Sequence, residues 1–486
     1  MNVRTLSAGH LTRDLADWRD SGRRPRPAFR ALAERISVLA QDGRLPAGTG
    51  LPGERDLAAA LEVSRTTVAA AYSLLRERGY LDSRQGARST VCLPSGPADS
   101  SSVGYRFGPM NEPDDAVIDL SYAAPTALPA VGRAYRQALE SMPEQFAGHG
   151  LGVVGNPRLR RAVADRYTAR GVPTRPEQIL ITHGAQQAMN LVIELLTAPG
   201  DRVLVEHPTY PHLVESITAA AGRIAPVPLT TEDGAAGWDL DGMRAAVQQL
   251  APSLAYLVVD HHNPTGLTLD EAGRRALAGI ARSARMTVVV DESMAELVLD
   301  GDRMPPMAAF GPAISIGSAS KVFWGGLRIG WVRADEATIT RLATARAPRD
   351  LGAPPLEQLA AALLLERADE LVAERTAQLR AGRTALTEAL RAELPQWRWV
   401  PGVGGLSLWV QLPQPVSSRL SAVAVDFGVV LTAGPRFGVN GAFEQWVRLP
   451  FVHEPSRLRQ CVTGLAAAYR AVTAGAGGAR EPALVV

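Results

Sequence analysis

The sequence predicts an α/β main domain with a mostly parallel sheet, preceded by a small helical domain that ends in two short strands. Three observations predict this. From about residue 118 onward, apolar strand-like runs such as 257–260 and 286–292 alternate with helical stretches, which we expect at 156–170, 184–197, 270–284 and 355–394. Residues 26–92 show three helical periods followed by two short strand-like runs. Between the two parts lies a segment rich in Pro, Gly, Ser and Asp, residues 93–117, which indicates a linker.

The composition is that of a globular protein with more than one domain. The chain has 486 residues, of which 46% are hydrophobic and 21% charged. Its two cysteines suggest neither a disulfide framework nor a metal site, and they predict a reducing cytoplasm. The charged N-terminus predicts no signal peptide, and no apolar run is long enough to suggest a membrane span.

The small domain, residues 26–92, begins after a polar, Arg-rich arm over residues 1–25. Residues 1–92 contain 15 Arg against 10 Asp plus Glu, a basic balance that favours a nucleic-acid contact. We expect helices over about 26–42 and over 54–61. The inward stripe of the first is Leu32, Ile36 and Leu39.

Ser64 is placed to cap a third helix, whose inward positions are Val68, Tyr72 and Leu75. Two strands around an RQGAR turn follow over 81–91 and form a natural wing. The bland alternative is a small helical domain with a solvated Arg face. The motifs LPGER at 51–55, SRTTV at 64–68 and QG at 85–86, however, closely resemble the GntR family of winged helix-turn-helix regulators. The resemblance implies binding to a double-stranded DNA operator, and the residues expected to contact DNA are Arg55, Ser64, Arg65, Thr66, Thr67, Gln85, Gly86 and Arg88.

In the large domain, residues 118–475, one residue is singled out by composition. The chain contains 50 arginines and a single lysine, Lys321. A guanidinium stays protonated, whereas an amine can lose its proton and attack a carbonyl. A lysine left on the surface by chance is the alternative, so the neighbours of Lys321 decide between the two.

Those neighbours suit pyridoxal 5′-phosphate (PLP), with Lys321 as the residue that forms the Schiff base. This cofactor needs a phosphate cradle, an acid for its ring nitrogen, a donor to its phenolic oxygen and a stacking face. Asp291 ends an apolar strand and suits the ring nitrogen, Asn263 suits the phenolic oxygen, and Tyr210 suits the ring face. The candidate phosphate cradle consists of Gly184, Ala185 and Gln186 at a helix start, with Ser318, Ser320 and Arg328.

Arg448, on a late strand, is expected to bind an effector or substrate carboxylate. Each signal alone has a plainer explanation, such as a capping carboxylate, a turn asparagine, a core tyrosine or a surface ion pair. Together their order and spacing resemble fold-type-I aminotransferases over nearly all of residues 118–470. The fusion of the two domains resembles the MocR/PdxR regulators. That resemblance implies a homodimeric, cytoplasmic regulator that senses PLP, or PLP with a small amino-compound effector.

Two departures from the family pattern bear on activity. Ser293 and Met294 stand where these proteins carry a tyrosine that bonds the phenolic oxygen, and His149 is the candidate replacement for a second missing tyrosine. Both departures favour a sensor over an enzyme. The alternatives are an active aminotransferase with an accessory head, and a PLP-independent repressor whose large domain is a dimerisation platform. A disordered tail is expected over 476–486.

Overall fold

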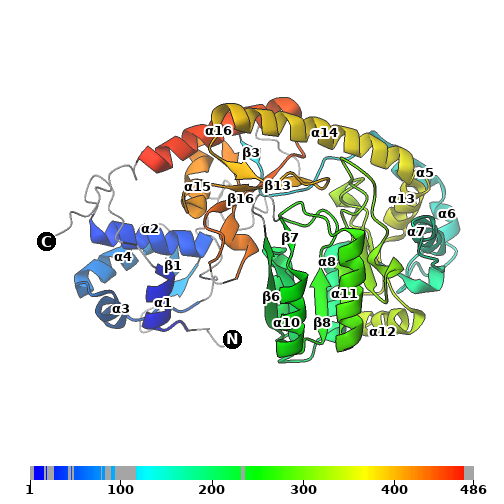
Figure 1. Ribbon diagram of the computed structural model, residues 1–486, viewed down its shortest axis with the longest axis horizontal. Helices are drawn as coiled ribbons and strands as arrows, with labels where there is room; N and C mark the ends of the chain where they lie inside the picture. The colour runs from blue at the N-terminus through cyan, green and yellow to red at the C-terminus, as the bar shows by residue number, and fades with distance from the viewer. Residues whose placement is uncertain are drawn as a thin grey trace. The chain divides into compact units, whose positions relative to one another are not determined.

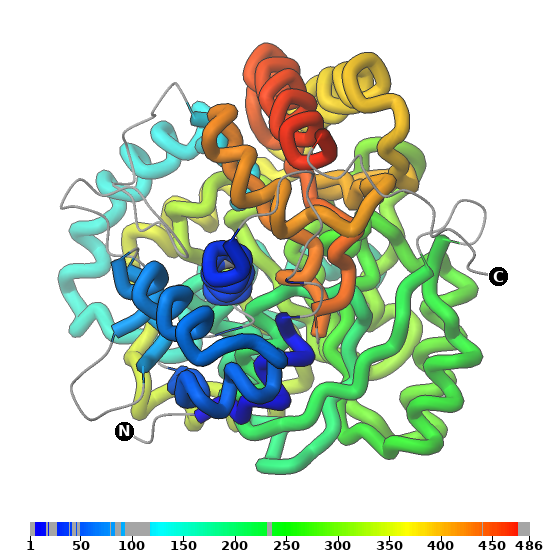
Figure 2. Tube along the Cα trace, turned by 90° about the vertical axis from the view of Figure 1, so that its left-hand side faces the viewer, coloured from blue at the N-terminus to red at the C-terminus, as the bar shows by residue number. Residues whose placement is uncertain are grey.

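The protein is described by a computed structural model, shown in Figures 1 and 2. It describes residues 5–15, 18, 27–41, 45, 49–77, 79–82, 89–92, 117–230, 236–439 and 441–474. The chain divides into two compact units, residues 1–119 with 412–447 and 461–486, and residues 120–411 with 448–460. The expected tail over 476–486 and nearly all of the expected linker lie outside the described residues.

The predicted helices of the small domain are present. They are α2 (Ala28–Gln41), α3 (Glu54–Leu61) and α4 (Arg65–Glu77), followed by the antiparallel strands β1 (Leu81–Asp82) and β2 (Thr90–Val91). The predicted inward residues of α2 and α4 are all buried in one apolar core, at 2% exposure or less. Glu62 takes a left-handed conformation (φ 54°) and closes the tight connection between α3 and α4.

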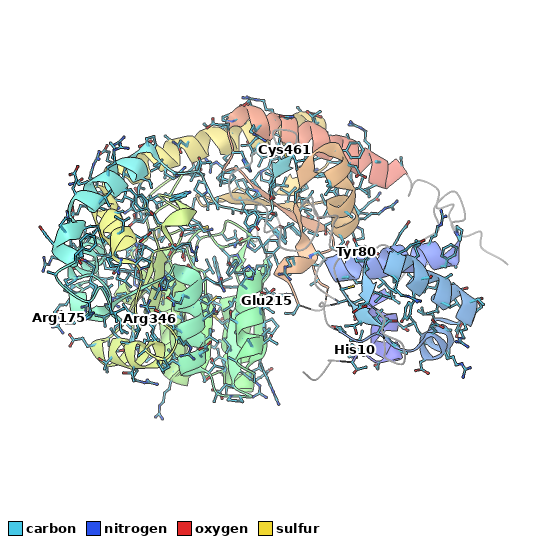
Figure 3. The ribbon with its side chains drawn as sticks, turned by 180° about the vertical axis from the view of Figure 1, so that it is seen from behind. His10, Tyr80, Arg175, Glu215, Arg346 and Cys461 are labelled. Carbon is cyan, nitrogen blue, oxygen red and sulfur yellow. The ribbon has the colours of Figure 1, made fainter. Side chains whose placement is uncertain are left out.

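A further helix lies where the sequence predicts only an arm. Helix α1 (Ala8–Leu15) buries Leu11 and Leu15 completely in the same core, and Trp18 joins them. Figure 3 labels His10 on this helix and Tyr80 near β1. Because leucines four residues apart share one helix face, this spacing was the signal that the Arg-rich composition concealed.

The other described elements of this unit come from distant parts of the chain. Strand β3 (Ile118–Asp119) pairs in parallel with β14 (Val429–Val430), and Ile118 N donates to Gly428 O at 2.8 Å. Helix α15 (Ser417–Ala424) and strand β15 (Thr432–Ala433) belong to the same unit.

The second unit is built on an eight-stranded sheet, and the predicted mostly parallel α/β fold is confirmed. Strands β6, β5, β8, β9 and β10 are mutually parallel, while β11 runs antiparallel to both of its neighbours. The sheet order is β4 (Ile179–Thr182), β11 (Gly330–Arg333), β10 (Ile314–Ser318), β9 (Thr287–Asp291), β8 (Leu254–Leu257), β5 (Arg202–His207), β6 (Arg223–Thr230) and β7 (Gly237–Trp238). The central strands are buried on both faces, which explains their continuous apolar runs.

The strand expected over 257–260 is shifted. Strand β8 ends at Leu257, because the Val258 amide donates to the Glu206 carboxylate at 2.9 Å instead of to a neighbouring strand. A buried side chain thus ends the strand where apolar composition alone predicts that it continues.

Helices surround this sheet in the second unit. The predicted helices appear as α7 (Pro157–Ala169), α8 (Ala185–Leu196) and α11 (Glu271–Ala284). The single helix expected over 355–394 is two, α13 (Pro355–Leu365) and α14 (Ala368–Glu393), because the backbone at Arg367 leaves helical geometry (φ −115°, ψ 22°). The remaining helices of four or more residues that lie wholly in this unit are α5 (Pro129–Glu140), α6 (Met142–Gln145), α9 (Pro211–Ala219), α10 (Leu240–Leu250) and α12 (Glu336–Arg346). Helix α16 (Pro455–Ala474) begins in this unit and continues in the first.

A buried arginine holds the edge strand β4 beside the loop before α7, since Arg346 donates to the Ile181 carbonyl oxygen. Arg346, labelled in Figure 3, is fully buried and donates to Val153 O at 2.9 Å and to Asp350 Oδ1 at 2.6 Å.

A smaller sheet contains the antiparallel strands β12 (Arg398–Trp399) and β13 (Ser407–Gln411). It also contains β16 (Trp446–Pro450), which carries Arg448. Among the described helices, none has the length and apolar character needed to cross a bilayer.

Candidate functional site

The site forms where several strands of the large sheet end on the same side. Asp291 ends β9 and Ser318 ends the neighbouring parallel strand β10. Strand β4 runs in the same direction as β10, since both are antiparallel to β11, and it leads into Gly184 and α8. Carboxyl ends of parallel strands are where α/β proteins place their ligands.

Lys321 lies in the turn after β10 and is half-buried. Its Nζ donates to the Ala123 carbonyl oxygen at 2.9 Å. Burial, and then the positive charges of Arg448 and Arg328, lower the Lys321 pKa from 10.5 to about 8, against the opposing effect of Asp291. A substantial fraction of this amine is therefore neutral near physiological pH, as a nucleophilic amine requires.

The Asp291 carboxylate is held by two hydrogen bonds. The Tyr256 hydroxyl donates to Oδ2 at 3.3 Å and the Ser293 amide donates to Oδ1 at 2.9 Å. Burial and the nearby Asp291 charge raise the pKa of Tyr256 well above its ordinary value, so this phenol stays a donor. The arrangement orients a carboxylate toward a cationic partner such as a protonated ring nitrogen.

The residues of the predicted phosphate cradle come from two turns that contact each other, one at His183 and Gly184 and one at Arg328. Arg328, in the left-handed conformation (φ 51°), donates from Nη2 to His183 O at 3.1 Å. A Cβ at Gly330 would lie 2.5 Å from the carbonyl carbon of Gly184, so this contact requires glycine. Gly184 itself has φ 86° and immediately precedes the first turn of α8, which contains Ala185 and Gln186.

The hydroxyl side of the cradle follows β10. Ser318 is buried, and its Oγ accepts a hydrogen bond from the Ser320 amide at 3.1 Å. Together with Arg328 and the amides at the start of α8, these hydroxyls form a donor set suited to a phosphate monoester. The predicted cradle residues therefore lie together, and their chemistry fits PLP.

Tyr210 caps α9, and its hydroxyl donates to Gln186 Oε1 at 3.2 Å, which ties the expected stacking ring to the cradle. Arg448 is buried, and its Nη1 donates to Asn263 Oδ1 at 3.4 Å. Its Nη2 donates to the Ser121 carbonyl oxygen. The predicted carboxylate-binding residue thus contacts the residue predicted to bind the phenolic oxygen.

Glu206 is a buried group that sequence reasoning missed. Its carboxylate accepts from Val258 N at 2.9 Å and from Trp238 Nε1 at 3.3 Å. Burial raises the Glu206 pKa from 4.5 to about 7, against the effect of these donors. The available signal was an acidic residue inside the apolar run VLVEH, since a charge within a buried strand needs partners.

Two further buried residues, His261 and His262, precede Asn263 and were also missed. Burial lowers the pKa of His261 to about 4 and that of His262 to about 3, so both rings are neutral at physiological pH. His262 Nδ1 contacts Thr265 Oγ1 at 2.9 Å within the Asn263 turn. These neutral rings support the turn that presents Asn263.

Ser293, Met294 and His149 stand where the resemblance leads us to expect tyrosines. Ser293 lines a narrow cavity of about 30 Å³ together with Tyr167 and Glu292, and Met294 is buried. Burial and the nearby Glu292 charge raise the pKa of Tyr167 well above its ordinary value, so this phenol stays protonated. His149 is exposed, and its Nδ1 accepts from the Leu151 amide at 3.0 Å.

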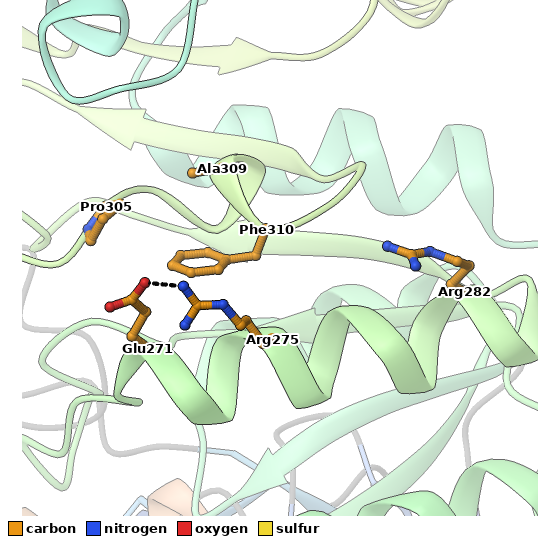
Figure 4. A pocket seen from close by; sticks show the side chains of 6 residues that line it. All are labelled: Glu271, Arg275, Arg282, Pro305, Ala309 and Phe310. Atoms are coloured by element: carbon orange, nitrogen blue, oxygen red, sulfur yellow. Dashed lines mark hydrogen bonds and ion pairs between the residues drawn. The ribbon is translucent and has the colours of Figure 1, made fainter.

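A second hollow lies between α11 and the segment 305–310 (Figure 4). It has a volume of about 450 Å³. Arg275 pairs there with Glu271, and its guanidinium lies 5.5 Å from the Phe310 ring centre. Arg282 lines the same hollow, and none of the predicted site residues does. This open surface feature is therefore separate from the site around Lys321.

The predicted DNA-contacting residues that the structure describes lie on α3 and on the start of α4. Ser64 Oγ accepts from the Thr67 amide at 3.1 Å, which confirms Ser64 as the helix cap. Arg65 and Thr66 are exposed in the first turn of α4, and Arg65 Nε lies 3.4 Å from Glu54. Arg55 is exposed on α3. Gln85, Gly86 and Arg88 lie outside the described residues.

Comparison with known proteins gives two family matches. Residues 119–465 match the family described as aminotransferase class I and II, and residues 29–91 match bacterial regulatory proteins of the gntR family. The HTH-type transcriptional regulator YdcR of Escherichia coli (strain K12) is 27% identical, over 86% of this chain and 93% of its own. The probable rhizopine catabolism regulatory protein MocR of Rhizobium meliloti is 29% identical, over 61% of this chain and 65% of its own.

Among solved structures, LysN of Thermus thermophilus superposes with a TM-score of 0.69. This α-aminoadipate aminotransferase was crystallised with N-(5′-phosphopyridoxyl)-L-leucine. It is 27% identical, and the match covers 74% of this chain and 93% of LysN. Both domain resemblances predicted from the sequence are confirmed.

Proposed function

Because this chain belongs to the aminotransferase class I and II family and joins a gntR-type DNA-binding domain to it, we propose that it is a transcriptional regulator that senses PLP. The arrangement of the two domains is that of MocR-type regulators. The proposed signal is PLP itself, or PLP together with a small amino compound. The proposed output is a change in binding to a double-stranded DNA operator.

The observation that carries this proposal is the environment of the single lysine. Burial and the charges of Arg448 and Arg328 lower the pKa of Lys321 to about 8, and the charge of Asp291 opposes this shift. A lysine exposed on the surface by chance would not have a pKa lowered by burial and by neighbouring arginines. This environment supports a role for Lys321 as the covalent anchor of the cofactor.

Each surrounding residue has a defined task in the proposed site. When bound, PLP supplies an aldehyde that captures amines and a ring that withdraws electrons. Asp291 would hold the proton on the ring nitrogen, and the cradle around Gly184 and Arg328 would bind the phosphate. Asn263 would donate from Nδ2 to the phenolic oxygen, and Arg448 would orient a carboxylate of the effector.

Sensing is favoured over turnover by the chemistry at positions 293 and 294. Neither Ser293 nor Met294 provides the phenol that would bond the phenolic oxygen and tune the acidity at the Lys321 nitrogen. We propose that the chain acts as a cytoplasmic homodimer, since gntR-type heads that bind an operator with two half-sites need a two-fold partner.

The alternative function is that of an active PLP-dependent aminotransferase. A specific observation supports it: the charges of Asp291, Arg328 and Arg448, three of the residues proposed for the site, act on the pKa of Lys321. The two functions differ in turnover: an enzyme converts many amino groups per site, whereas a sensor binds and holds its ligand.

The visible absorption of the full-length chain after addition of PLP tests the proposal. The wild type is expected to develop a new absorption band and Lys321→Ala is not. Arg282→Gln, an exposed α11 residue outside the site, serves as the matched control and is expected to behave as wild type. Identical spectra for wild type and Lys321→Ala would overturn the cofactor role of Lys321, and multiple turnovers with amino acids would favour the enzyme.

A further inference from the structure

Residues 121–123 connect the two ligand-binding side chains of the proposed site. The Ser121 carbonyl oxygen accepts a hydrogen bond from Arg448 Nη2. Two residues later, the Ala123 carbonyl oxygen accepts from Lys321 Nζ at 2.9 Å. Tyr122, between them, is 53% exposed. We call residues 121–123 the strap.

The chain is held by hydrogen bonds on both sides of the strap: by Arg375 on the C-terminal side, and by the pairing of β3 with β14 on the N-terminal side. On its C-terminal side, Thr126 O accepts from Arg375 Nη2 at 2.6 Å, and Arg375 Nε donates to Val322 O at 2.8 Å. This arginine therefore joins the chain after the strap to the turn that carries Lys321. On its N-terminal side, the strap follows β3 and the predicted linker along the chain.

We propose that the strap is a ligand-state reader whose two carbonyl contacts are exchanged for ligand contacts. The inference rests on the proposed function, because it requires that PLP attach at Lys321 and that a carboxylate bind at Arg448. Ser121 and Ala123 take part only through their backbone carbonyl oxygens. Sequence motifs therefore do not indicate these two contacts.

Attachment of the cofactor releases the Ala123 carbonyl. The Lys321 ammonium loses one proton, and the neutral amine attacks the aldehyde of PLP. A C=N bond forms, the aldehyde oxygen leaves as water with the two amine hydrogens, and the proton first lost returns to the imine nitrogen. This one proton would be shared with the phenolic oxygen of the cofactor. Nζ then has no N–H to donate to Ala123 O.

Binding of an effector carboxylate at Arg448 releases the other carbonyl. A carboxylate accepts charge-assisted hydrogen bonds from a guanidinium, and these are roughly twice as strong as the bond to a neutral carbonyl oxygen. The carboxylate therefore displaces Ser121 O. An effector amine that takes the place of Lys321 on the cofactor also frees Nζ to rebind Ala123 O.

Three states of the site consequently hold the strap differently. In the ligand-free chain, Arg448 bonds the Ser121 carbonyl and Lys321 bonds the Ala123 carbonyl. With PLP alone, only the bond from Arg448 to Ser121 remains. With PLP joined to an amino acid, only the bond from Lys321 to Ala123 remains. The effector class that this reading selects is an amino acid, because it needs both an amine and a carboxylate. The strap then transmits which ligand is bound to the chain segment that precedes it.

The test is the rate at which chymotrypsin cuts the full-length chain after Tyr122, resolved by mass spectrometry. Four samples are compared: ligand-free, PLP, pyridoxamine 5′-phosphate and N-(5′-phosphopyridoxyl)-L-leucine. PLP and the leucine adduct should each speed this cut roughly fivefold, as expected for the loss of one hydrogen bond. Pyridoxamine 5′-phosphate should not, because it neither bonds covalently to Lys321 nor presents a carboxylate. Equal rates with pyridoxamine phosphate and PLP would overturn the exchange.

Variants test the same contacts without ligand. Arg448→Gln and Lys321→Ala should each be cut faster than wild type in the ligand-free state, and Arg282→Gln should match wild type. Arg448→Gln should show no further change with the leucine adduct. Wild-type rates in both ligand-free variants would overturn the strap, and thermal unfolding checks that each variant is folded. Visible absorption of the same samples reports cofactor attachment, so a failure of the proposed function is distinguished from a failure of the strap.

Discussion

Arg448 Nη1 donates to Asn263 Oδ1 at 3.4 Å, which joins the residue expected to bind a carboxylate to the residue expected to bind the cofactor ring. Because Arg448 uses the oxygen of the Asn263 amide, the Nδ2 hydrogens are left to face the phenolic oxygen. The contact thereby sets the orientation of an amide whose two ends are otherwise interchangeable. An effector that draws Arg448 away changes this orientation as well.

Replacing Arg448 by glutamine is expected to weaken carboxylate binding selectively. The affinity for N-(5′-phosphopyridoxyl)-L-leucine should fall by roughly ten- to a hundredfold, the range for a lost hydrogen bond to a charged group. The affinity for pyridoxamine 5′-phosphate, which has no carboxylate, should change far less. Titrations followed by protein fluorescence measure both. Equal losses for the two ligands would contradict the role assigned to Arg448.

Attachment of PLP is expected to depend on pH with an inflection near 8. The attacking species is the neutral amine, and the Lys321 pKa is lowered from 10.5 to about 8. Stopped-flow absorbance between pH 6 and about 9.5 measures the attachment rate, a range that brackets this pKa. Because the Arg448 charge contributes to the lowering, Arg448→Gln should shift the inflection upward. An inflection that stays in place in this variant would contradict the electrostatic cause.

The same shift links Lys321 to stability in the ligand-free chain. The folded chain releases this proton near pH 8, whereas the unfolded chain retains it up to about 10.5. The unfolded state therefore binds more protons between these values, and the contribution of Lys321 to stability becomes more favourable as pH rises through this window. In denaturant unfolding, Lys321→Met should have a larger free energy of unfolding than wild type at pH 7, relative to the difference at pH 10, because the wild type gains stability as pH rises. A constant difference would contradict the pKa.

Replacing Glu206 by glutamine is expected to stabilise the fold at alkaline pH. Burial raises the Glu206 pKa from 4.5 to about 7, so the stability that this group provides is complete below 4.5 and is lost as pH rises through 7. The loss amounts to about 3 kcal/mol. Glutamine keeps an oxygen to accept from Val258 N and Trp238 Nε1. At pH 8 the melting temperature of Glu206→Gln should lie above that of wild type, and at pH 4 this difference should disappear.

Replacing Arg65 by alanine is expected to weaken DNA binding without unfolding the small domain. Arg65 is exposed at the start of α4, and its ion pair with Glu54 is a surface pair of little energetic consequence. The slope of log affinity against log salt should decrease by about 1 if Arg65 contacts a phosphate. Arg76→Ala, in the last turn of α4, serves as the comparison. Unchanged affinity and slope in Arg65→Ala would remove this residue from the interface.

The sequence predicted those parts of the fold that periodicity and terminal residues encode. Helix α3 begins and ends where expected, and Ser64 caps α4 as predicted. The end of β8 at Leu257 was missed because it depends on the contact of Val258 N with Glu206, which leaves no local pattern. The break at Arg367 was also missed. Helix α1 was missed because its two buried leucines lie among arginines and aspartates.

Within the site, chemistry-bearing side chains were predictable and backbone partners were not. Lys321, Asp291 and Arg448 stand in recognisable motifs, and the structure brings them into electrostatic contact. The carbonyls of Ser121 and Ala123 carry no side-chain signature, and they lie about 200 or more residues away from their donors along the chain. Contacts of this kind follow only from the folded backbone.

Footprinting on DNA from the region upstream of the gene tests the central proposal most directly. Wild type and Lys321→Ala are compared, each with and without PLP and with DNA in trace amounts. A sensor that reads the cofactor through Lys321 predicts that PLP changes the protection pattern or the affinity for wild type and leaves Lys321→Ala unchanged. The same response to PLP in both proteins, or no response in wild type, would contradict a regulator that senses PLP at Lys321.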